Sequence, residues 1–412
     1  MSPADPFDLP HDAPYGVHNL PYGVFSTPAD PTRRRLGVRY GDHVLDAGAA
    51  ARATGAPTDL ADLLAAPSLG PLLAAGRPAW TTVRAALTSW LTAPEHRAAV
   101  APCLLPLTDT VPHLPFEVAD YVDFYASEHH ASNVGRIFRP GADALPPNWK
   151  HLPIGYHGRA GTVVVSGTDV VRPCGQRREP GEQEPSYGPS VRLDIEAEVG
   201  FVVGTPSARG ERVALADADD HVFGLCLLND WSARDIQAWE YVPLGPMLGK
   251  SFATSVSAWV TPLDALRYAR TDPPPRDPAP LPYLDDRAAP VPYGLDLALE
   301  VRLNGHVVAR PPFAGMYWTY AQMLAHLTVN GASLRTGDLF GSGTVSGPVR
   351  ETRGALIELS WNGAEPLRLP DGTERAFLED GDEVAISATA PGPDGARLAL
   401  AEVRGRVRPA RP

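Results

Sequence analysis

Alternation of apolar and polar side chains along much of the chain predicts short β-strands. Residues 120–125, 194–201 and 355–361 each alternate in this way, which is the pattern of a strand with one buried face. Residues 222–228 are apolar or glycine throughout, so we expect a strand buried on both faces. All four segments lie in the second part of the chain, which we therefore expect to be rich in β-structure.

The first hundred residues have a pattern of their own. Residues 36–45 alternate around a Gly-Asp turn, which is typical of a β-hairpin. Apolar side chains then recur at helical spacing and predict one amphipathic helix, whose buried face comprises Trp80, Val83, Leu87 and either Trp90 or Leu91. Prolines interrupt the segment that follows, and we place a domain boundary there, near Phe116. We expect a small N-terminal domain, residues 1–116, and a larger domain, residues 117–412.

Composition supports a protein of strands and loops. The chain has 45 prolines and 38 glycines among its 412 residues, about a fifth of the total, whereas ordinary usage is about 12%. Eight of the prolines lie between residues 271 and 294, which we interpret as a long surface loop rather than a linker between domains. The fold class expected is mainly β.

Charge and cysteine content narrow the setting in which the protein works. A net charge of −12 argues against a nucleic-acid or anionic-membrane partner. The three cysteines, Cys103, Cys174 and Cys226, form neither a disulfide framework nor a paired metal motif. The first residues lack the pattern of a signal peptide, and no apolar stretch approaches the roughly 18 residues of a membrane span. We expect a soluble, cytoplasmic protein.

Acidic side chains are the first candidates for chemistry. Glu196 and Glu198 are two residues apart on a predicted strand, so they share a face about 7 Å apart along the strand. Asp123 lies on another predicted strand, and Asp230 follows the buried segment 222–228. If these carboxylates converge, a hard cation such as Mg²⁺ or Ca²⁺ would relieve their repulsion better than Zn²⁺. The alternative for the two glutamates is a solvated outer face.

Donor side chains follow directly after Asp230. Arg234, Gln237 and Tyr241 have the spacing of one helix face, which suits the binding of an oxygen-rich anion. An ordinary polar helix face with an Asp230–Arg234 ion pair is the alternative. A glycine-spaced loop then brings in Lys250. A second glycine-rich loop, residues 341–347, fits no nucleotide-binding motif, so we expect no nucleotide.

A histidine is the candidate general base. His129 and His130 follow the strand of Asp123, and Glu358 lies on a predicted strand within residues 355–361. An imidazole oriented by a carboxylate can activate water at neutral pH. The alternative is a surface or structural histidine. No Gly-x-Ser-x-Gly motif occurs and no cysteine carries a nucleophile motif, so a serine or cysteine hydrolase is disfavoured.

Several long motifs resemble those of one enzyme family. They span the whole chain and comprise residues 19–26, 120–125, 130–135, 152–159, 229–235, 239–246 and 249–252. On these motifs the chain is similar to the fumarylacetoacetate hydrolase family. The resemblance implies an SH3-like β-barrel as N-terminal domain, a mixed β-roll as larger C-terminal domain, and a homodimer. It also implies hydrolytic cleavage of a carbon–carbon bond in 4-fumarylacetoacetate, the last step of tyrosine catabolism. The substrate would be a dicarboxylate diketone.

The same resemblance assigns roles to residues of this chain. The catalytic cation, Ca²⁺ or Mg²⁺, is expected on Asp123, Glu196, Glu198 and Asp230. A second cation is implied beside Asp230, Lys250 and Thr254, with a main-chain oxygen from the lysine because an ammonium group cannot ligate a metal. His130 matches the general base and Glu358 its orienting carboxylate. Arg234, Gln237 and Lys250 match the groups that stabilise the oxyanion and the leaving group. The expected substrate contacts are Tyr125, Arg139, Tyr156, Gln237, Tyr241 and Thr344.

The chain departs from the family pattern in a few places. Ala253 stands where we expect glycine, which bears on the second cation, and His129 stands where another polar residue is common. The loop 271–294 is longer than expected. Two other functions stay open: another superfamily enzyme, such as an acylpyruvate hydrolase or an oxaloacetate-type decarboxylase, and a non-catalytic Ca²⁺-binding β protein.

Overall fold

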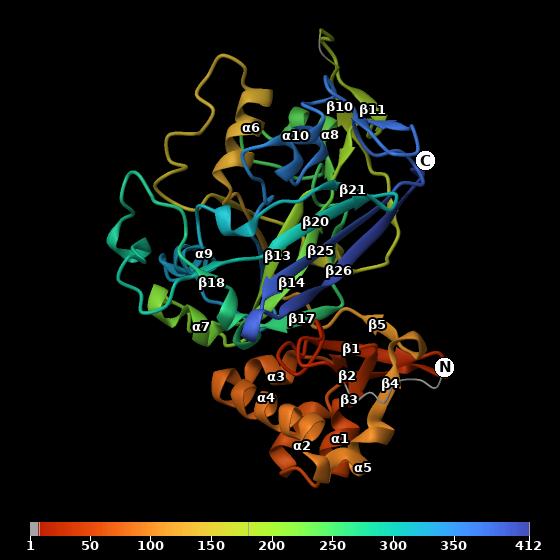
Figure 1. Ribbon diagram of the computed structural model, residues 1–412. Coiled ribbons are helices and arrows are strands. Elements are labelled where there is room, and N and C mark those ends of the chain that lie inside the picture. Colours follow the sequence, from red (N-terminus) through yellow and green to blue (C-terminus); the bar gives the residue numbers. More distant parts are fainter. Residues whose placement is uncertain (1–6, 8, 180, 412) are drawn as a thin grey trace.

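One large β-sheet runs through both parts of the molecule. The computed structural model describes residues 7, 9–179 and 181–411, and within them the sheet has 13 strands. Its main path runs β4-β3-β2-β1-β17-β14-β13-β22-β6-β7, so strands from the beginning of the chain continue into strands from its middle and end. Figure 1 shows the N-terminal part, in red and orange, at the bottom of the molecule.

The N-terminal part combines a small sheet with a layer of helices. Its strands are β1 (Tyr22–Thr27), β2 (Asp30–Tyr40), β3 (His43–Asp46), β4 (Leu104–Pro106) and β5 (Val111–His113), and its helices are α1 (Ala47–Ala53), α2 (Thr58–Leu64), α3 (Gly70–Ala74), α4 (Gly76–Thr92) and α5 (Arg97–Val100). The predicted hairpin is present, with Tyr40 paired to His43 across the turn. Among the described residues no pairing joins β4 to β5, so this sheet is open and no closed barrel is found.

The predicted amphipathic helix is α4. Its buried face contains Trp80, Val83, Leu87, Trp90 and Leu91, which matches the periodicity of the sequence. Each such side chain stabilises the fold by about 1.5–3 kcal/mol when it is fully buried. Trp80 also packs edge-on against Phe223, with 5.2 Å between ring centroids. Because Phe223 belongs to the C-terminal part of the chain, this core crosses the boundary between the two parts.

Strand β1 carries the sheet across that boundary. It pairs with β17 (Trp259–Pro262) through Tyr22 opposite Val260 and Gly23 opposite Trp259. A Cβ atom on Gly23 would lie 2.5 Å from the Trp259 ring, so the close approach of the two strands requires glycine here.

The C-terminal part packs the large sheet against a second one. Its share of the large sheet comprises β6 (Tyr121–Phe124), β7 (Gly155–His157), β8 (Val163–Val165), β13 (Ala197–Val203), β14 (Val222–Asp230), β16 (Thr254–Val256), β17 and β22 (Leu339–Gly341). The second sheet has the order β21 (His306–Ala309), β20 (Ala298–Leu303), β25 (Glu383–Pro391), β26 (Arg397–Arg408) and β9 (Val170–Val171). Every residue of β14 is buried, as the sequence predicts. A mainly β architecture with a smaller N-terminal domain is therefore confirmed.

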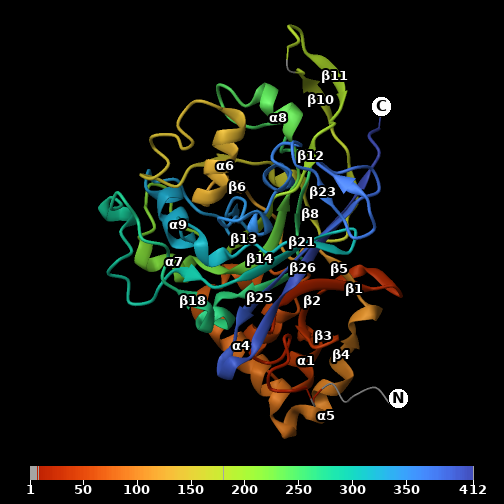
Figure 2. The same ribbon diagram turned by 45° about the horizontal axis from the view of Figure 1, so that its top comes forward.

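Helices gather at the end of the molecule farthest from the N-terminal part. Figure 1 shows α6 (Glu128–Phe138), α8 (Arg234–Glu240) and α10 (Leu356–Leu359) together in this region, and Figure 2 shows α6 and α8 there from a second direction. Further elements of the C-terminal part include α7 (Ala218–His221), α9 (Tyr320–Thr328) and the strand pairs β10 (Cys174–Arg177) with β11 (Ser186–Pro189), β12 (Leu193–Asp194) with β15 (Ser232–Ala233), and β23 (Leu367–Arg368) with β24 (Glu374–Arg375). No helix in the described ranges is long and apolar enough to cross a membrane.

The strand predicted over residues 355–361 is wrong, because this segment contains the short helix α10. The carboxylate of Asp194 accepts hydrogen bonds from the backbone N–H groups of Leu356 and Ile357 at the start of the helix. Positive φ angles at Trp361 and Asn362 follow its end. In so short a segment, alternation of side chains cannot distinguish a helical turn from a strand.

The proline-rich segment is a loop whose base is closed by two strands. β18 (Arg270–Thr271) pairs with β19 (Gly294–Leu295), so the chain leaves and returns at the same place. Arg276 attaches the loop to the rest of the protein through the side chain of Gln322, at 2.7 Å, and it also pairs with Asp286 of the same loop, at 2.6 Å. The segment is therefore a surface loop with its own anchor and not a linker.

Candidate active site

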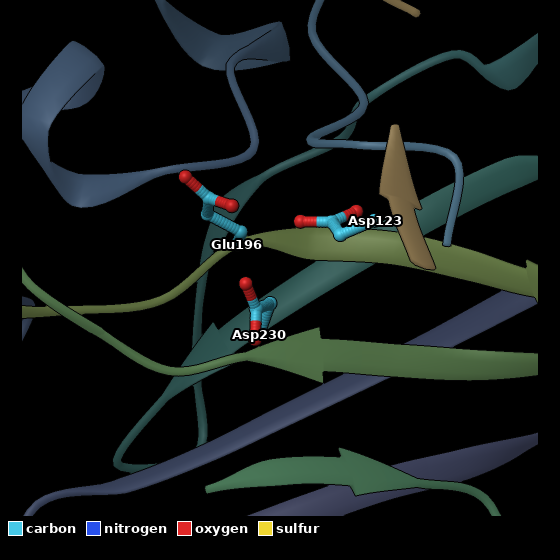
Figure 3. Close-up of side chains that lie close together, drawn as sticks. All are labelled: Asp123, Glu196 and Asp230. Carbon is cyan, nitrogen blue, oxygen red and sulfur yellow. The ribbon is translucent and has the colours of Figure 1, made fainter. Parts of the chain in front are cut away.

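Three carboxylates meet where their strands end. Asp123 lies on β6, Glu196 directly precedes β13, and Asp230 is the last residue of β14. One oxygen of each lies within 4.8 Å of the others (Figure 3). The alternative of a solvated outer face is wrong for the two glutamates, because Glu196 is 5% exposed and Glu198 is fully buried.

Glu198 adds a fourth carboxylate beside Asp123. A Cβ atom on Gly341 of β22 would lie 2.8 Å from an oxygen of each side chain, so glycine makes room for both. Burial, reinforced by the surrounding carboxylates, raises the pKa of Asp123 and of Glu198 well above the usual range. The two groups are thus costly to ionise in the absence of a compensating positive charge.

Positive charge reaches this cluster from Lys250. Its Nζ atom donates to Glu196 Oε2 at 2.5 Å and to Asp230 Oδ2 at 2.8 Å. Burial alone would lower the pKa of Lys250, but Asp230 and Glu196 outweigh it and raise that pKa. Tyr156 and Thr254 also donate to Asp230, each at 2.9 Å. The lysine side chain therefore meets the cluster with its ammonium group.

His130 and Glu358 form a buried pair next to the acidic cluster. The Nδ1 atom of His130 lies 2.6 Å from Glu358 Oε2, and its Nε2 atom faces Glu196 Oε1 at 3.7 Å. Asn133 and Ser346 each donate to Glu358 at 2.8 Å. Burial would raise the pKa of Glu358, but His130 and these hydrogen bonds lower it overall. Glu358 is therefore held as a carboxylate that orients the imidazole.

Arg234 connects the start of α8 to the same cluster. Its Nε atom donates to Asp194 at 2.8 Å, its Nη1 atom donates to Gln237 at 3.0 Å, and its Nη2 atom forms an ion pair with Glu196 Oε1 at 2.8 Å. The alternative pairing of Arg234 with Asp230 is wrong, because Asp194 and Glu196 are its partners. Burial would lower the pKa of Arg234, but these carboxylates outweigh it and keep the pKa above its usual value.

The remaining predicted site residues border this centre or lie beside α6. The Tyr125 ring stands edge-on to the His130 imidazole at 5.4 Å between centroids. Thr344 is buried, and its Oγ1 atom has no hydrogen-bond partner among the described residues. Arg139 follows α6 and donates to the Ala144 carbonyl at 3.1 Å. Tyr241 follows α8 and stacks on Phe138 of α6.

The two unusual positions have ordinary surroundings. His129 is half-buried on α6, next to His130 in the chain. The structure records no hydrogen bond from it to the described site residues. Ala253 is buried and belongs to the main apolar core. Neither position brings a new polar group to the acidic cluster.

Sequence reasoning missed three polar residues that hold the site together. Asp194 lies in the same acidic segment as Glu196, and nothing in the sequence marks it as the partner of Arg234. Asn133 is three residues from His130 on α6, a spacing that places both on one helix face. Ser346 lies in the glycine-rich loop, where no local signal marks it.

The acidic cluster can hold a divalent cation, since one oxygen each of Asp123, Glu196 and Asp230 lies within 4.8 Å of the others. Asp123 Oδ1 and Glu198 Oε1 are buried oxygens with no hydrogen-bond partner within the described part of the chain. Buried polar atoms are seldom left unpaired, and an all-oxygen donor set suits a hard cation. The arrangement is that of a mainly β enzyme with an acidic cluster, able to hold a divalent cation, beside a histidine–carboxylate pair.

Comparison with known proteins places the chain in a family. The family model for the fumarylacetoacetate (FAA) hydrolase C-terminal domain matches residues 120–407, and that for the fumarylacetoacetase N-terminal domain matches residues 18–115. Fumarylacetoacetase of Caenorhabditis elegans is 46% identical over 417 residues, 98% of each chain. The Homo sapiens fumarylacetoacetase is 45% identical over 412 residues, 97% of each chain. The chain belongs to the fumarylacetoacetate hydrolase family and is a hydrolase that acts on carbon–carbon bonds.

Solved structures share the fold at much lower identity. Fumarylacetoacetate hydrolase from Exiguobacterium antarcticum has a TM-score of 0.55 at 16% identity, over 95% of this chain and 100% of that one. The 5-carboxymethyl-2-hydroxymuconate delta-isomerase from Mycobacterium smegmatis has a TM-score of 0.50 at 15% identity, over the same shares. A hydrolase and an isomerase thus have this fold, and it alone does not determine the reaction.

Proposed function

We propose that this protein is a fumarylacetoacetase, which hydrolyses 4-fumarylacetoacetate to fumarate and acetoacetate. The observation that carries the proposal is the buried His130–Glu358 pair, whose free Nε2 atom faces the acidic cluster at Glu196. The names of relatives that match nearly the whole chain support the same activity.

A divalent cation, Ca²⁺ or Mg²⁺, belongs to the proposal. Asp123, Glu196, Glu198 and Asp230 would hold it. When bound, the cation would supply Lewis-acid polarisation of the two oxygens of a β-dicarbonyl. A second cation would lie beside Asp230, Lys250 and Thr254, with the main-chain oxygen of Lys250 as a ligand, since the Lys250 ammonium group itself donates to Asp230.

The proton transfers are assigned to His130. Ionised Glu358 accepts the Nδ1–H of His130, which leaves Nε2 free to take a proton from water. The water oxygen bonds to the carbonyl carbon of the fumaryl end while its proton passes to Nε2. When the carbon–carbon bond breaks, its electron pair goes to the acetoacetate carbon as an enolate. The proton on Nε2 then passes to that carbon.

Cationic donors stabilise the charge that develops in this sequence. Arg234 and Lys250 lie on opposite oxygens of Glu196, and Gln237 holds Arg234 from its own helix. One such donor to an oxyanion lowers the barrier by about 3 kcal/mol. We assign the oxyanion to Arg234 with Gln237, and the enolate leaving group to Lys250.

Contacts to the substrate complete the assignment. A cavity of about 520 Å³ reaches Asp230 and Lys250 and is lined by Tyr156 among others. The proposed contacts are Tyr125, Arg139, Tyr156, Gln237, Tyr241 and Thr344. Thr344 Oγ1 is buried and unpaired among the described residues, so it is free to bind an oxygen of the substrate.

Assembly and location are part of the proposal. We infer a homodimer, and the exposed apolar side chains of Val242, Leu244, Met247 and Leu248 offer a surface that a second copy would cover. We infer a cytoplasmic location, which the three free cysteines support. Size-exclusion chromatography with light scattering measures the molar mass of the protein in solution. A molar mass of one chain would overturn the proposed homodimer.

The activity is tested directly on purified protein. Cation-loaded protein should consume fumarylacetoacetate and release equimolar fumarate and acetoacetate, as identified by mass spectrometry. Absence of turnover overturns the proposal. Parallel assays with an acylpyruvate and with oxaloacetate test the other superfamily activities, and faster turnover of either would favour them.

Substitution of the base separates an enzyme from a binding protein. His130→Ala should lower kcat by about 10²- to 10⁴-fold while calorimetry still detects cation binding. His129→Ala is the matched control and should keep wild-type kcat. Unchanged turnover in His130→Ala would remove His130 as the base.

A further inference from the structure

The side chain of Asp194 is bonded to both arms of the proposed site. Its Oδ2 atom accepts from Arg234 Nε at 2.8 Å and from the N–H of Ile357 at 3.1 Å. Its Oδ1 atom accepts from the N–H of Leu356 at 2.7 Å. The two amides belong to the residues directly before Glu358, so one carboxylate holds both the arginine and the start of the Glu358 helix.

These contacts close a ring of interactions around the reaction centre. From Asp194 the ring passes to Arg234 and on to Glu196 at 2.8 Å. It continues to His130 at 3.7 Å and to Glu358 at 2.6 Å. Helix α10 leads from Glu358 back to Asp194. Asp194 therefore links the proposed base His130, its carboxylate partner Glu358 and the oxyanion donor Arg234, although Asp194 itself touches none of the reacting atoms.

The place of Asp194 is itself fixed by the fold. Its side chain is fully buried, and its backbone pairs with Ser232 between β12 and β15. Arg234 is the first residue of α8 and directly follows β15, so the short ladder between β12 and β15 holds Asp194 beside it. Removal of the carboxylate would leave a buried guanidinium with one carboxylate partner instead of two.

We propose that Asp194 is a positioning residue that sets the geometry of Arg234 and Glu358 together. The inference rests on the proposed function, because it assigns both partners a part in carbon–carbon bond hydrolysis. Positioned groups tolerate little displacement, and a shift of about 1 Å can lower a rate by about 10²-fold. Loss of the Asp194 carboxylate should lower kcat more than it changes KM, since the substrate does not set the positions of Arg234 and Glu358.

The test is Asp194→Asn, which keeps the size of the side chain and one acceptor oxygen. We expect kcat to fall by about 10²-fold with KM changed less than about threefold. Asp235→Asn is the control: Asp235 is next to Arg234 but accepts from Ser190 and Val191. The control should keep wild-type kcat. Wild-type kcat in Asp194→Asn would overturn the inference.

A double-mutant cycle separates positioning from general support of the fold. Arg234→Lys should lower kcat much less in the Asp194→Asn variant than in the wild-type protein. Glu358→Gln should likewise lower kcat much less in the Asp194→Asn variant. Additive losses would overturn the inference. If Asp194→Asn does not fold, Asp194→Glu takes its place, and failure of both to fold would also overturn it.

Failure of the proposed function is recognised separately. Wild-type protein without fumarylacetoacetate turnover would overturn that function but not the arrangement around Asp194. A crystal structure of Asp194→Asn then decides the inference. Arg234 should leave Glu196 and α10 should shift, whereas an unchanged Arg234 and α10 would overturn it.

Discussion

Nδ1 of His130 lies 2.6 Å from Oε2 of Glu358, although 228 residues separate them in the chain. His130 is on α6, and Glu358 is on α10, which begins at the carboxylate of Asp194. Three distant segments must therefore be in place before the histidine has its orienting partner. The proposed base is a product of the completed fold and not of any local motif.

Replacement of Glu358 by glutamine should abolish most of the activity. The amide cannot stabilise an imidazolium, and its NH₂ group would oppose the Nδ1–H of His130. We expect kcat to fall by about 10²- to 10⁴-fold, measured with saturating substrate and cation. Glu351→Gln, at an exposed position nearby in the chain, should leave kcat unchanged. Equal kcat in both variants would contradict the role of Glu358.

Glu358 should also make stability depend on pH in the acid range. Its folded-state pKa is lowered, so its contribution is present above the unfolded value of about 4.3 and is lost as pH falls through the folded pKa. Urea unfolding of wild type and Glu358→Gln should differ by about 1–3 kcal/mol at pH 7. The difference should shrink below about pH 4. If the difference in unfolding free energy between the two proteins stays constant down to about pH 3, the charge of Glu358 is not the cause of that difference.

Chelation of divalent cations should lower both activity and thermal stability. The acidic cluster contains two carboxyl groups whose pKa burial raises, so a bound cation should relieve a real electrostatic cost. At a cation concentration of 100 times Kd, the folded state should gain about 2.7 kcal/mol. Differential scanning calorimetry with and without added Ca²⁺ or Mg²⁺ measures this. Glu198→Gln should reduce the gain, and an equal gain in that variant would exclude Glu198 as a ligand.

A methyl group at Gly341 should weaken cation binding. Its Cβ would lie 2.8 Å from oxygens of both Asp123 and Glu198, so one carboxylate must move. We expect Kd for the cation to rise about tenfold or more, measured by calorimetry. Gly161→Ala is the control, because a Cβ there meets nothing within 4 Å. Similar Kd values in the two variants would mean that the spacing at Gly341 does not matter.

Strand periodicity predicted some parts of the site well. Asp230 follows an apolar run that is buried along its whole length, and the two-residue spacing of Glu196 and Glu198 places both beside Asp123. Their convergence could not be predicted, since it depends on β22 lying between β6 and β13. The sequence predicts Glu358 as the partner of His130, and the two side chains are in contact. The predicted element is wrong, because Glu358 lies on helix α10 and not on a strand. Asp194 accepts the hydrogen bonds at the start of this helix. Such long-range capping has no local signature.

The pairing of Gly23 with Trp259 has a consequence for inherited or engineered changes far from the reaction centre. A sheet that continues from one domain into the other should melt in a single cooperative transition. A damaging substitution among the first hundred residues should therefore lower the amount of folded enzyme in a cell and leave the kcat of the surviving molecules near normal. Removal of those residues would expose the edge of β17, and the remainder should aggregate rather than persist as a smaller enzyme.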